Sequence, residues 1–515
     1  MNIHSKAPRL AGMVATDDDR PHAVVIGTGF GGLAAGVRLG ARGYRVTLID
    51  AMDRIGGRAA VTEQDGFVFD GGPTIITAPV VYEELWDLCG KRMEDHVSLK
   101  SLNPFYSIRF DNGDVYRCFA NEDEVEAEIK RFSPDDLPGY HSFLAEAEKC
   151  FKAGYEKMID TPFLSLKDMA FALPDLIARR ADRSIHKLAA KHIKDHRLRM
   201  ALSFHPLFIG GNPLKTSSVM SLISHMERIW GVHFTMGGTG ALAEGIADLV
   251  RDQGGVFRLA EKVDEILVTG GSASGVRLAS GETIEADIVV SNAEPGHTYK
   301  HLLAKQKRKR WTDRKVDRAK YSMSLFVWYL GTSERFEDVD LHTIILGPRY
   351  RGLLEDIFDK KHLAEDFSLY LYRPTAEDPS LAPEGCDTFY VLAPVPNLEG
   401  TTDWESFEEE YKQKVAERLE MTVMPGFTDK IVTSKVVTPL HFRDNLHSTK
   451  GAAFGMQPLI TQLAWFRPHN KSEEIENLYL VGAGTHPGAG VPAVVSSAKI
   501  LDKIVPHANE LAARN

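Results

Sequence analysis

Three glycines near the start of the chain, Gly27, Gly29 and Gly32, have the spacing G-x-G-x-x-G. In a turn from a strand into a helix, the first glycine permits the tight turn and the second lets backbone approach a pyrophosphate. The third allows close packing of helix on strand, and the N–H groups at the helix N-terminus bind the phosphates. Asp50 follows Gly32 by 18 residues, where a carboxylate can accept hydrogen bonds from ribose hydroxyls. These residues predict a dinucleotide-binding site.

The elements that must position these residues occur in the right order. Residues 23–27 are an apolar run of strand length, residues 33–42 are typical of a helix with small residues on one side, and residues 44–50 indicate a second strand. A purely structural glycine turn remains the alternative. It would not require the second strand or the acid at its end.

A second glycine pair decides which dinucleotide is expected. Gly57 and Arg58 close the segment D-R-I-G-G-R, which would bring backbone amides and a guanidinium to the same diphosphate. Residues 67–74 then indicate another strand followed by Gly-Gly-Pro-Thr. In this pattern the chain resembles the amine-oxidase-like flavoprotein superfamily, which implies FAD rather than NAD. The acid of that superfamily is usually Glu, and Asp50 is compatible with the same hydrogen bonds.

Later segments return to the same style, with glycine turns and short apolar strands around residues 237–291 and 478–497. We therefore expect an α/β fold, with a discontinuous Rossmann-like FAD-binding domain and an inserted α+β substrate domain. The expected FAD-binding domain comprises residues 22–78, 232–298 and 440–515. The expected substrate and membrane-associated domain comprises residues 79–231 and 299–439, and residues 1–21 are expected to form a flexible tail.

Three blocks carry a narrower resemblance, to the carotenoid desaturases of bacteria and fungi and specifically to the phytoene desaturases: residues 22–74, 204–232 and 477–497. The resemblance implies a membrane-associated enzyme with non-covalent FAD. Such enzymes introduce double bonds stepwise into phytoene, a forty-carbon hydrocarbon, towards neurosporene or lycopene. Of these two products, we expect lycopene rather than neurosporene.

The resemblance also implies which residues border the flavin. They are Pro73, Thr74 and the loop from Gly484 to Val491, and we add Val263, at the start of a predicted strand, to the cofactor-binding residues. Phytoene carries no charge or hydroxyl, so its binding requires a long apolar tunnel. Residues 201–209 and 323–330 are candidate walls, with ordinary core as the alternative for any one residue.

Removal of two hydrogens from adjacent carbons transfers a hydride to the flavin and a proton elsewhere. His205, His225 and Glu227 are candidates for a general base. The structural alternative, in which both histidines are satisfied core groups and Glu227 pairs with Arg228, is favoured for each. A flavin–substrate geometry without a side-chain base is also possible, so no catalytic residue is assigned.

Composition excludes several other classes. The net charge of −10 disfavours a nucleic-acid partner. His186, His192 and His196 lie among Arg and Lys, which repel cations, so no metal site is expected. Four scattered cysteines without a C-x-x-C pair are typical of a reducing compartment. We expect a cytoplasmic protein that associates peripherally with a membrane.

Two basic segments break the acidic average. Residues 179–199 hold eight Lys or Arg against two Asp, and residues 305–320 hold nine against two. In the first segment Ile185, Leu188 and Ile193 recur at helical spacing, which predicts an amphipathic helix at an anionic lipid surface. The expected partners are thus phytoene and its desaturated intermediates, a lipid surface, and quinone or oxygen as electron acceptor.

Two alternatives to a phytoene desaturase remain. The first is a related carotenoid oxidoreductase, either an isomerase or a late-pathway desaturase. The second is a non-catalytic isoprenoid-binding escort protein of the same fold. Escort proteins have lost the complete flavin machinery, whereas the glycines, Asp50 and Arg58 are all present here.

Overall fold

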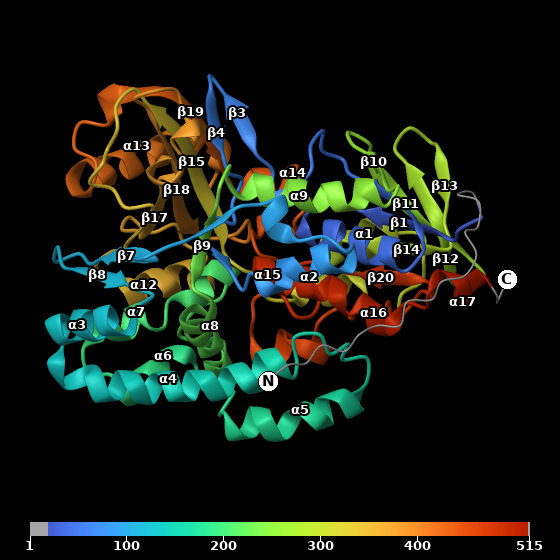
Figure 1. The fold of residues 1–515 in the computed structure, drawn as a ribbon, viewed down its shortest axis with the longest axis horizontal. Helices are drawn as coiled ribbons and strands as arrows, with labels where there is room; N and C mark the ends of the chain where they lie inside the picture. Colours follow the sequence, from blue (N-terminus) through green and yellow to red (C-terminus); the bar gives the residue numbers. More distant parts are fainter. Residues whose placement is uncertain (1–18, 513–515) are drawn as a thin grey trace.

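The computed structural model describes residues 19–512, so the first 18 residues of the predicted tail, 1–21, lie outside the described residues. Two sheets stand side by side (Figure 1), a five-stranded sheet in one half and a seven-stranded sheet in the other. No helix in the described range combines the length and the apolar character needed to cross a membrane.

The five-stranded sheet is parallel throughout. Its side chains alternate between two buried faces: Ala23 and Val25 face a helical layer, whereas Val24 and Ile26 face a small antiparallel sheet. Burial on both faces explains why these strands are continuous apolar runs. The strand order is β10 (Val256–Arg258), β2 (Arg45–Ile49), β1 (His22–Ile26), β14 (Ile288–Ser291) and β20 (Leu478–Leu480). The small sheet holds β11 (Val263–Thr269), β12 (Ser272–Leu278) and β13 (Thr283–Glu285).

Helix α1 (Phe30–Ala41) lies at the centre of the helical layer and packs against α9 (Thr239–Asp252) and α15 (Val491–Lys499). Close packing requires small residues: a Cβ on Gly36 would lie 3.1 Å from a methyl of Val250 on α9. Parallel strands connected through helices, with the glycine turn between β1 and α1, are the Rossmann-like arrangement. The predicted α/β fold class is confirmed.

The seven-stranded sheet is antiparallel except for one parallel pair, β7 with β16. One face, which includes Trp328 and Val391, packs on α13 (Trp404–Thr422), and the other face, which includes Val327 and Tyr390, looks towards the flavin half. The order is β19 (Ile431–Val437), β15 (Ser324–Thr332), β18 (Asp387–Val395), β17 (Leu369–Tyr372), β16 (His342–Ile345), β7 (Tyr106–Arg109) and β8 (Val115–Cys118).

A layer of helices lies beneath this sheet in Figure 1. Helix α5 forms the lower edge of the molecule and begins with a capping box between Ser165 and Asp168. The layer contains α3 (Glu122–Phe132), α4 (Leu137–Phe151), α5 (Leu166–Ala178), α6 (Ile185–His192), α7 (His196–Ala201) and α8 (Leu222–Trp230).

Residues just after the predicted boundary at 298 pack on the flavin side. Tyr299, Trp311 and Val316 share a core with Val24 and Val289 of the parallel sheet. Large aromatic side chains beside a sheet face gain more from that burial than from exposure. The domain division given above remains a prediction, and this segment is where its boundary is least sharp.

Candidate active site

One cavity of about 1500 Å³ extends from the carboxyl end of the parallel sheet to the inner face of the seven-stranded sheet. Ligand sites for small molecules usually measure roughly 300–1000 Å³. The cavity is therefore large enough for a dinucleotide and a long substrate together. Its two ends differ in chemistry, with glycine backbone at one end and apolar side chains at the other.

The G-x-G-x-x-G turn forms the first end. Gly27 has a φ of +93°, which favours glycine, and Gly27 and Gly29 both line the cavity. Gly32 lies behind them in α1, where an added Cβ would be only 1.9 Å from the carbonyl oxygen of Gly27. Glycine at 32 thus lets α1 start directly against the turn, with its N-terminus at the cavity.

Asp50 follows strand β2 and is held by three donors. Its Oδ2 accepts from the Thr28 N–H and hydroxyl, both at 2.7 Å, and its Oδ1 accepts from the Met52 N–H at 2.9 Å. The residue is buried but lines the cavity. A carboxylate fixed at this edge of the sheet fits the role of accepting from ribose hydroxyls.

The second glycine pair lies directly on the first turn. Gly56 donates its N–H to the Thr28 carbonyl at 3.0 Å, and Gly57 has a φ of +57°. Arg58 donates from Nη2 to the Ser448 hydroxyl at 2.9 Å, while its Nε is buried without a partner. Burial lowers the pKa of Arg58, and the nearby Glu294 carboxylate opposes this. An unsatisfied guanidinium N–H beside bare backbone fits a diphosphate.

The other predicted flavin residues divide into two groups. Pro73, Thr74, Val263 and Val491 all line the cavity, and Thr74 shares a hydrogen bond of 2.6 Å with the Tyr370 hydroxyl. Gly484 does not line the cavity. Its backbone lies against Pro295, whose Cδ would be 2.1 Å from an added Cβ. Gly484 therefore acts through packing of its loop, and its assignment to the flavin remains a prediction.

Two polar residues of the flavin end were not singled out from the sequence. Asn292 follows β14 and fills the space between the glycine loops, because a Cβ on Gly31 or Gly482 would lie 2.5 Å or 2.4 Å from its Oδ1. Arg467 is buried and donates to the carbonyls of Met456, Gln462 and Ala483. Burial lowers the pKa of Arg467 to about 10. Asn292 could have been found from its place at the end of a buried parallel strand.

The other end of the cavity is an apolar wall. Strand β15 points Leu325, Val327 and Tyr329 into the cavity, and the alternate residues Phe326 and Trp328 point to α13. Only half of the predicted wall at 323–330 therefore faces the cavity, as the two-residue period of a strand requires. The cavity is also lined by Phe204, Leu207, Phe208, Ile209, Tyr370, Tyr390 and Leu392.

The candidate bases lie in different places. Glu227 lines the cavity and bonds to Tyr106 and His205, whereas His225 lies against the Phe151 ring at 5.1 Å and does not line it. The expected pairing of Glu227 with Arg228 is wrong. Arg228 donates to the Phe119 carbonyl, because consecutive residues of a helix point in different directions.

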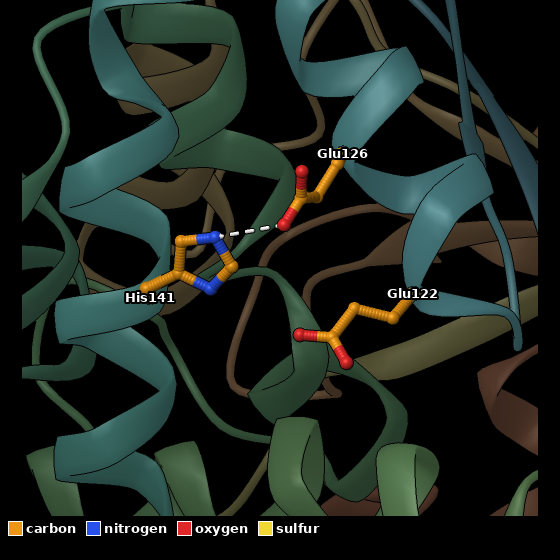
Figure 2. A group of neighbouring side chains, drawn as sticks. All are labelled: Glu122, Glu126 and His141. Carbon is orange, nitrogen blue, oxygen red and sulfur yellow. Dashed lines mark ion pairs between the residues drawn. The ribbon is translucent and has the colours of Figure 1, made fainter.

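The described residues hold one cluster whose ligand atoms are close enough for a metal ion: Glu122 and Glu126 of α3 with His141 of α4 (Figure 2). The Glu126 carboxylate already pairs with Lys130 at 3.0 Å and His141 at 3.2 Å. Of the three histidines considered from the sequence, His186 bonds to the Ser203 hydroxyl. The Glu122 cluster does not line the cavity.

The fold and the site together define a flavin-dependent oxidoreductase. The family model for flavin-containing amine oxidoreductases matches residues 30–500. The chain is 50% identical over 499 residues to the neurosporene-forming phytoene desaturase of Cereibacter sphaeroides, covering 96% of each chain. It is 46% identical over 477 residues to the lycopene-forming phytoene desaturase of Pseudescherichia vulneris, covering 92% of this chain and 97% of the other. The chain therefore belongs to the flavin-containing amine oxidoreductases, and within them to the carotenoid desaturases.

Solved structures agree on the fold. A redesigned putrescine oxidase has a TM-score of 0.63 at 13% identity, and cyclohexylamine oxidase from Brevibacterium oxydans has 0.58 at 18%. Each comparison covers 96% of this chain and 99% of the other. The predicted cofactor FAD, the oxidoreductase class and the family are confirmed.

Proposed function

We propose that the chain is an FAD-dependent phytoene desaturase, which dehydrogenates phytoene stepwise to neurosporene or lycopene. Relatives that are 43–50% identical over nearly the whole chain carry the name of this activity with either product. The observation that supports it best is the continuity of the glycine-lined end with an apolar wall in one cavity of about 1500 Å³. A hydrocarbon offers no polar group, so apolar area must provide its binding.

The residues of this chain bind, orient and exclude water. Gly29, Asp50, Gly57 and Arg58 would hold the dinucleotide, and Thr74 and Val491 would border its reactive ring. Bound FAD supplies the hydride acceptor for dehydrogenation. Val327, Tyr390 and the other wall residues would keep the reacting carbons dry and in register.

We further propose that the protein binds a lipid surface through α5. One side of this helix packs on Met158 and Phe163, yet Leu166, Phe171 and Ile177 on the helix are 66%, 74% and 65% exposed. Helix α5 also carries Lys167, Asp168 and Asp175, but large apolar side chains lie on its exposed side as well as its packed side. Several exposed apolar side chains on one helix call for an apolar partner. An enzyme whose substrate dissolves in a bilayer offers that partner.

The exposed surface of α5 is continuous with the cavity. Leu173 and Ile177 line the cavity and are also exposed, as are Ile460 and Phe466 on the neighbouring short helices η13 (Ile460–Gln462) and η14 (Ala464–Phe466). A hydrocarbon would thus enter from the lipid without crossing water. Each Å² of its apolar surface that stays out of water avoids a free-energy cost of about 25 cal/mol.

In this proposal, the two basic segments contribute less to lipid binding than the sequence predicted. Ile185, Leu188 and Ile193 are buried in the core, so the apolar face of α6 is not available to lipid. Helical periodicity is the same for a core-facing and a lipid-facing helix, which explains the error. In the second segment, exposed Arg314 and Arg318 border a hollow shared with Phe466, where they can meet anionic headgroups.

Two experiments test these proposals. Holoprotein incubated with phytoene in liposomes, with either a quinone or oxygen as acceptor, should consume phytoene, and product analysis separates neurosporene from lycopene. No consumption with either acceptor would contradict the proposed activity. A modified carotenoid consumed in place of phytoene would favour the related oxidoreductase.

Co-sedimentation with anionic phospholipid vesicles tests the lipid surface. Phe171→Glu should weaken binding by about tenfold, because a buried Phe contributes roughly 1.5–3 kcal/mol. Met421→Glu is the matched control, since Met421 on α13 is also 74% exposed but far from the cavity lining. Equal losses in both variants would contradict a role for α5.

A further inference from the structure

A cluster of three buried polar side chains lies behind the apolar half of the cavity: Tyr106 on β7, His205 in η5 (His205–Ile209) and Glu227 on α8. Of the three, Glu227 lines the cavity. The Tyr106 hydroxyl donates to both Glu227 carboxylate oxygens at 2.9 Å. His205 Nε2 lies 3.1 Å from Glu227 Oε2. Their exposed fractions are 2%, 3% and 7% respectively. Three separate elements thus converge on one carboxylate.

Among the described residues, no guanidinium or ammonium forms an ion pair with this carboxylate. Within residues 19–512, the ion pair formed by Glu227 is with His205, and Arg228 turns to Phe119 and Phe105 instead. A buried carboxylate without a full cationic partner costs several kcal/mol, which structural positions usually avoid. The Nδ1 of His205 is also buried without a partner, so the cluster is not a closed structural network.

Glu128 shows what a structural buried glutamate looks like in the same chain. It is 8% exposed, comparable with Glu227. Its carboxylate accepts from the Arg131 guanidinium at 2.6 Å and 2.7 Å and from the Arg117 N–H at 2.9 Å. It does not line the cavity. The two glutamates therefore differ in having a cation and in facing the ligand space.

Glu227 faces the same cavity as the residues expected to border the flavin. Ile223 and Met226 on the same helix, with Phe204 and Phe208, line the cavity around it. The Phe208 ring lies 6.1 Å from the ring of Tyr370, whose hydroxyl bonds to Thr74 at 2.6 Å. Glu227 and Thr74, the residue expected to border the flavin, thus line one cavity with these aromatic side chains.

We propose that Glu227 is the catalytic base that receives the proton in each desaturation, with Tyr106 and His205 as positioning residues. Bound FAD would supply the acceptor for the hydride, that is, the hydrogen that leaves one carbon with its electron pair. The neighbouring carbon gives its hydrogen as a proton to the Glu227 carboxylate, and the electrons of that C–H bond form the new double bond. The negative charge also favours the cationic character that develops on the allylic carbon. This assignment rests on the proposed function.

The test is single-turnover reduction of the holoprotein by phytoene in the absence of oxygen. The loss of the oxidised-flavin absorbance measures the rate of reduction. Glu227→Gln keeps the size of the side chain and removes the base, so reduction should slow by about 10²–10⁴-fold. FAD content and the half-saturating phytoene concentration should stay unchanged. Glu128→Gln, the matched control, should reduce at the rate of the unmodified protein.

A second measurement is independent of turnover. If Glu227 is retained for chemistry at a cost in stability, Glu227→Gln should raise the melting temperature by roughly 1–3 °C. Glu128→Gln breaks an ion pair and should lower it. A lower melting temperature in Glu227→Gln would assign Glu227 a structural role and overturn the proposal. This conclusion would hold whether or not the variant retained FAD.

These measurements distinguish failure of the assigned base from failure of the proposed desaturase activity. Normal reduction by Glu227→Gln overturns the base and leaves the desaturase intact. Failure of the unmodified holoprotein to be reduced by phytoene overturns the proposed function, and this assignment with it. Tyr106→Phe should slow reduction by about tenfold at an unchanged half-saturating concentration, since it removes one hydrogen bond to a charged group.

Discussion

The two ends of the cavity are built by opposite means. At the flavin end, function depends on missing side chains: Gly27, Gly29 and Gly57 let backbone form the surface. At the hydrocarbon end, alternate side chains of a sheet form the surface, as Val327 and Tyr329 do on β15. Backbone can bind phosphates because every residue carries an N–H, whereas shape for an apolar chain must come from side chains.

This difference explains which parts of a binding site can be recognised in a sequence. A glycine cradle is formed by a few adjacent residues, because its geometry is local. An apolar wall is distributed over β15, β17, β18, α8 and η5, and each contributes two to four residues. The first end tolerates little substitution, and the second should tolerate exchange among apolar residues of similar volume.

The largest effect is expected from a charge in the apolar wall. Leu392 lines the cavity on β18, opposite Val327 and Tyr370 on the flanking strands. Leu392→Asp should abolish phytoene consumption, at least about 1000-fold, because a buried ion costs several kcal/mol. FAD content should remain normal. The control Val432→Asp changes a 54% exposed residue of β19 and should keep both properties; loss of FAD in Leu392→Asp would show that the two ends are not separable.

A smaller effect, on FAD binding rather than on phytoene binding, is expected from Gly32→Ala. The new Cβ would lie 1.9 Å from the Gly27 carbonyl, so the turn must move. FAD binding, measured by flavin released from the purified protein and by titration of the apoprotein, should weaken by about 100-fold, or roughly 2.7 kcal/mol. Gly113→Ala, where a Cβ meets nothing within 4 Å, bears only the cost of a positive φ and should bind FAD normally. Full FAD affinity in Gly32→Ala would refute the cradle.

Asp50→Ala should weaken FAD binding by about tenfold, because one charge-assisted hydrogen bond contributes roughly 1.5–3 kcal/mol. Asp50→Glu keeps the carboxylate and should lose less. Titration of both apoproteins with FAD measures the difference. Equal weakening in the two variants would mean that the Thr28 contacts, not the ribose, set the requirement for Asp50.

The smallest effect concerns Asp70, a buried carboxylate that accepts hydrogen bonds from Tyr372 on β17 and from Gly240 on α9. Burial raises the pKa of Asp70 from its ordinary value of 3.8 to about 6, although Tyr372 donates to it. The folded protein keeps a proton that the unfolded chain has lost, so stability should fall as pH rises from about 4 to 6. Asp70→Asn should lack this component of the decline in a melting-temperature profile. Identical profiles for both proteins would refute the raised pKa.

The glycine cradle of the flavin end was largely predictable, because residues 27–32 and 56–58 are two short segments that interact through backbone. Asn292 and Arg467 come from distant parts of the chain and were missed.

At the hydrocarbon end, two wall segments, residues 201–209 and 323–330, were predicted and contribute lining residues. The polar contacts behind that wall were not predictable. Tyr106 and Glu227 are 121 positions apart, and nothing local links them. The expected pairing with Arg228 relied on adjacency in sequence, which on a helix does not mean a shared direction.

Lipid contact shows a second limit. The pattern of Ile185, Leu188 and Ile193 correctly indicated an amphipathic helix, but periodicity cannot tell whether the apolar face meets core or lipid. Helix α5 was not singled out, because its apolar residues lie on several sides and Pro174 interrupts its pattern. Exposure, which only the fold reveals, distinguishes the two helices.

The strand order of the parallel sheet affects how the protein can fold during its synthesis. Strands β1 and β2 leave the ribosome first, whereas β20 and α15, which complete the same layer, come near the end of the chain. At roughly 5–20 residues per second, translation separates them by on the order of a minute. Until then the nascent sheet has an open edge beside β14. Cofactor capture should therefore be a post-translational event, and chaperones should be needed before it.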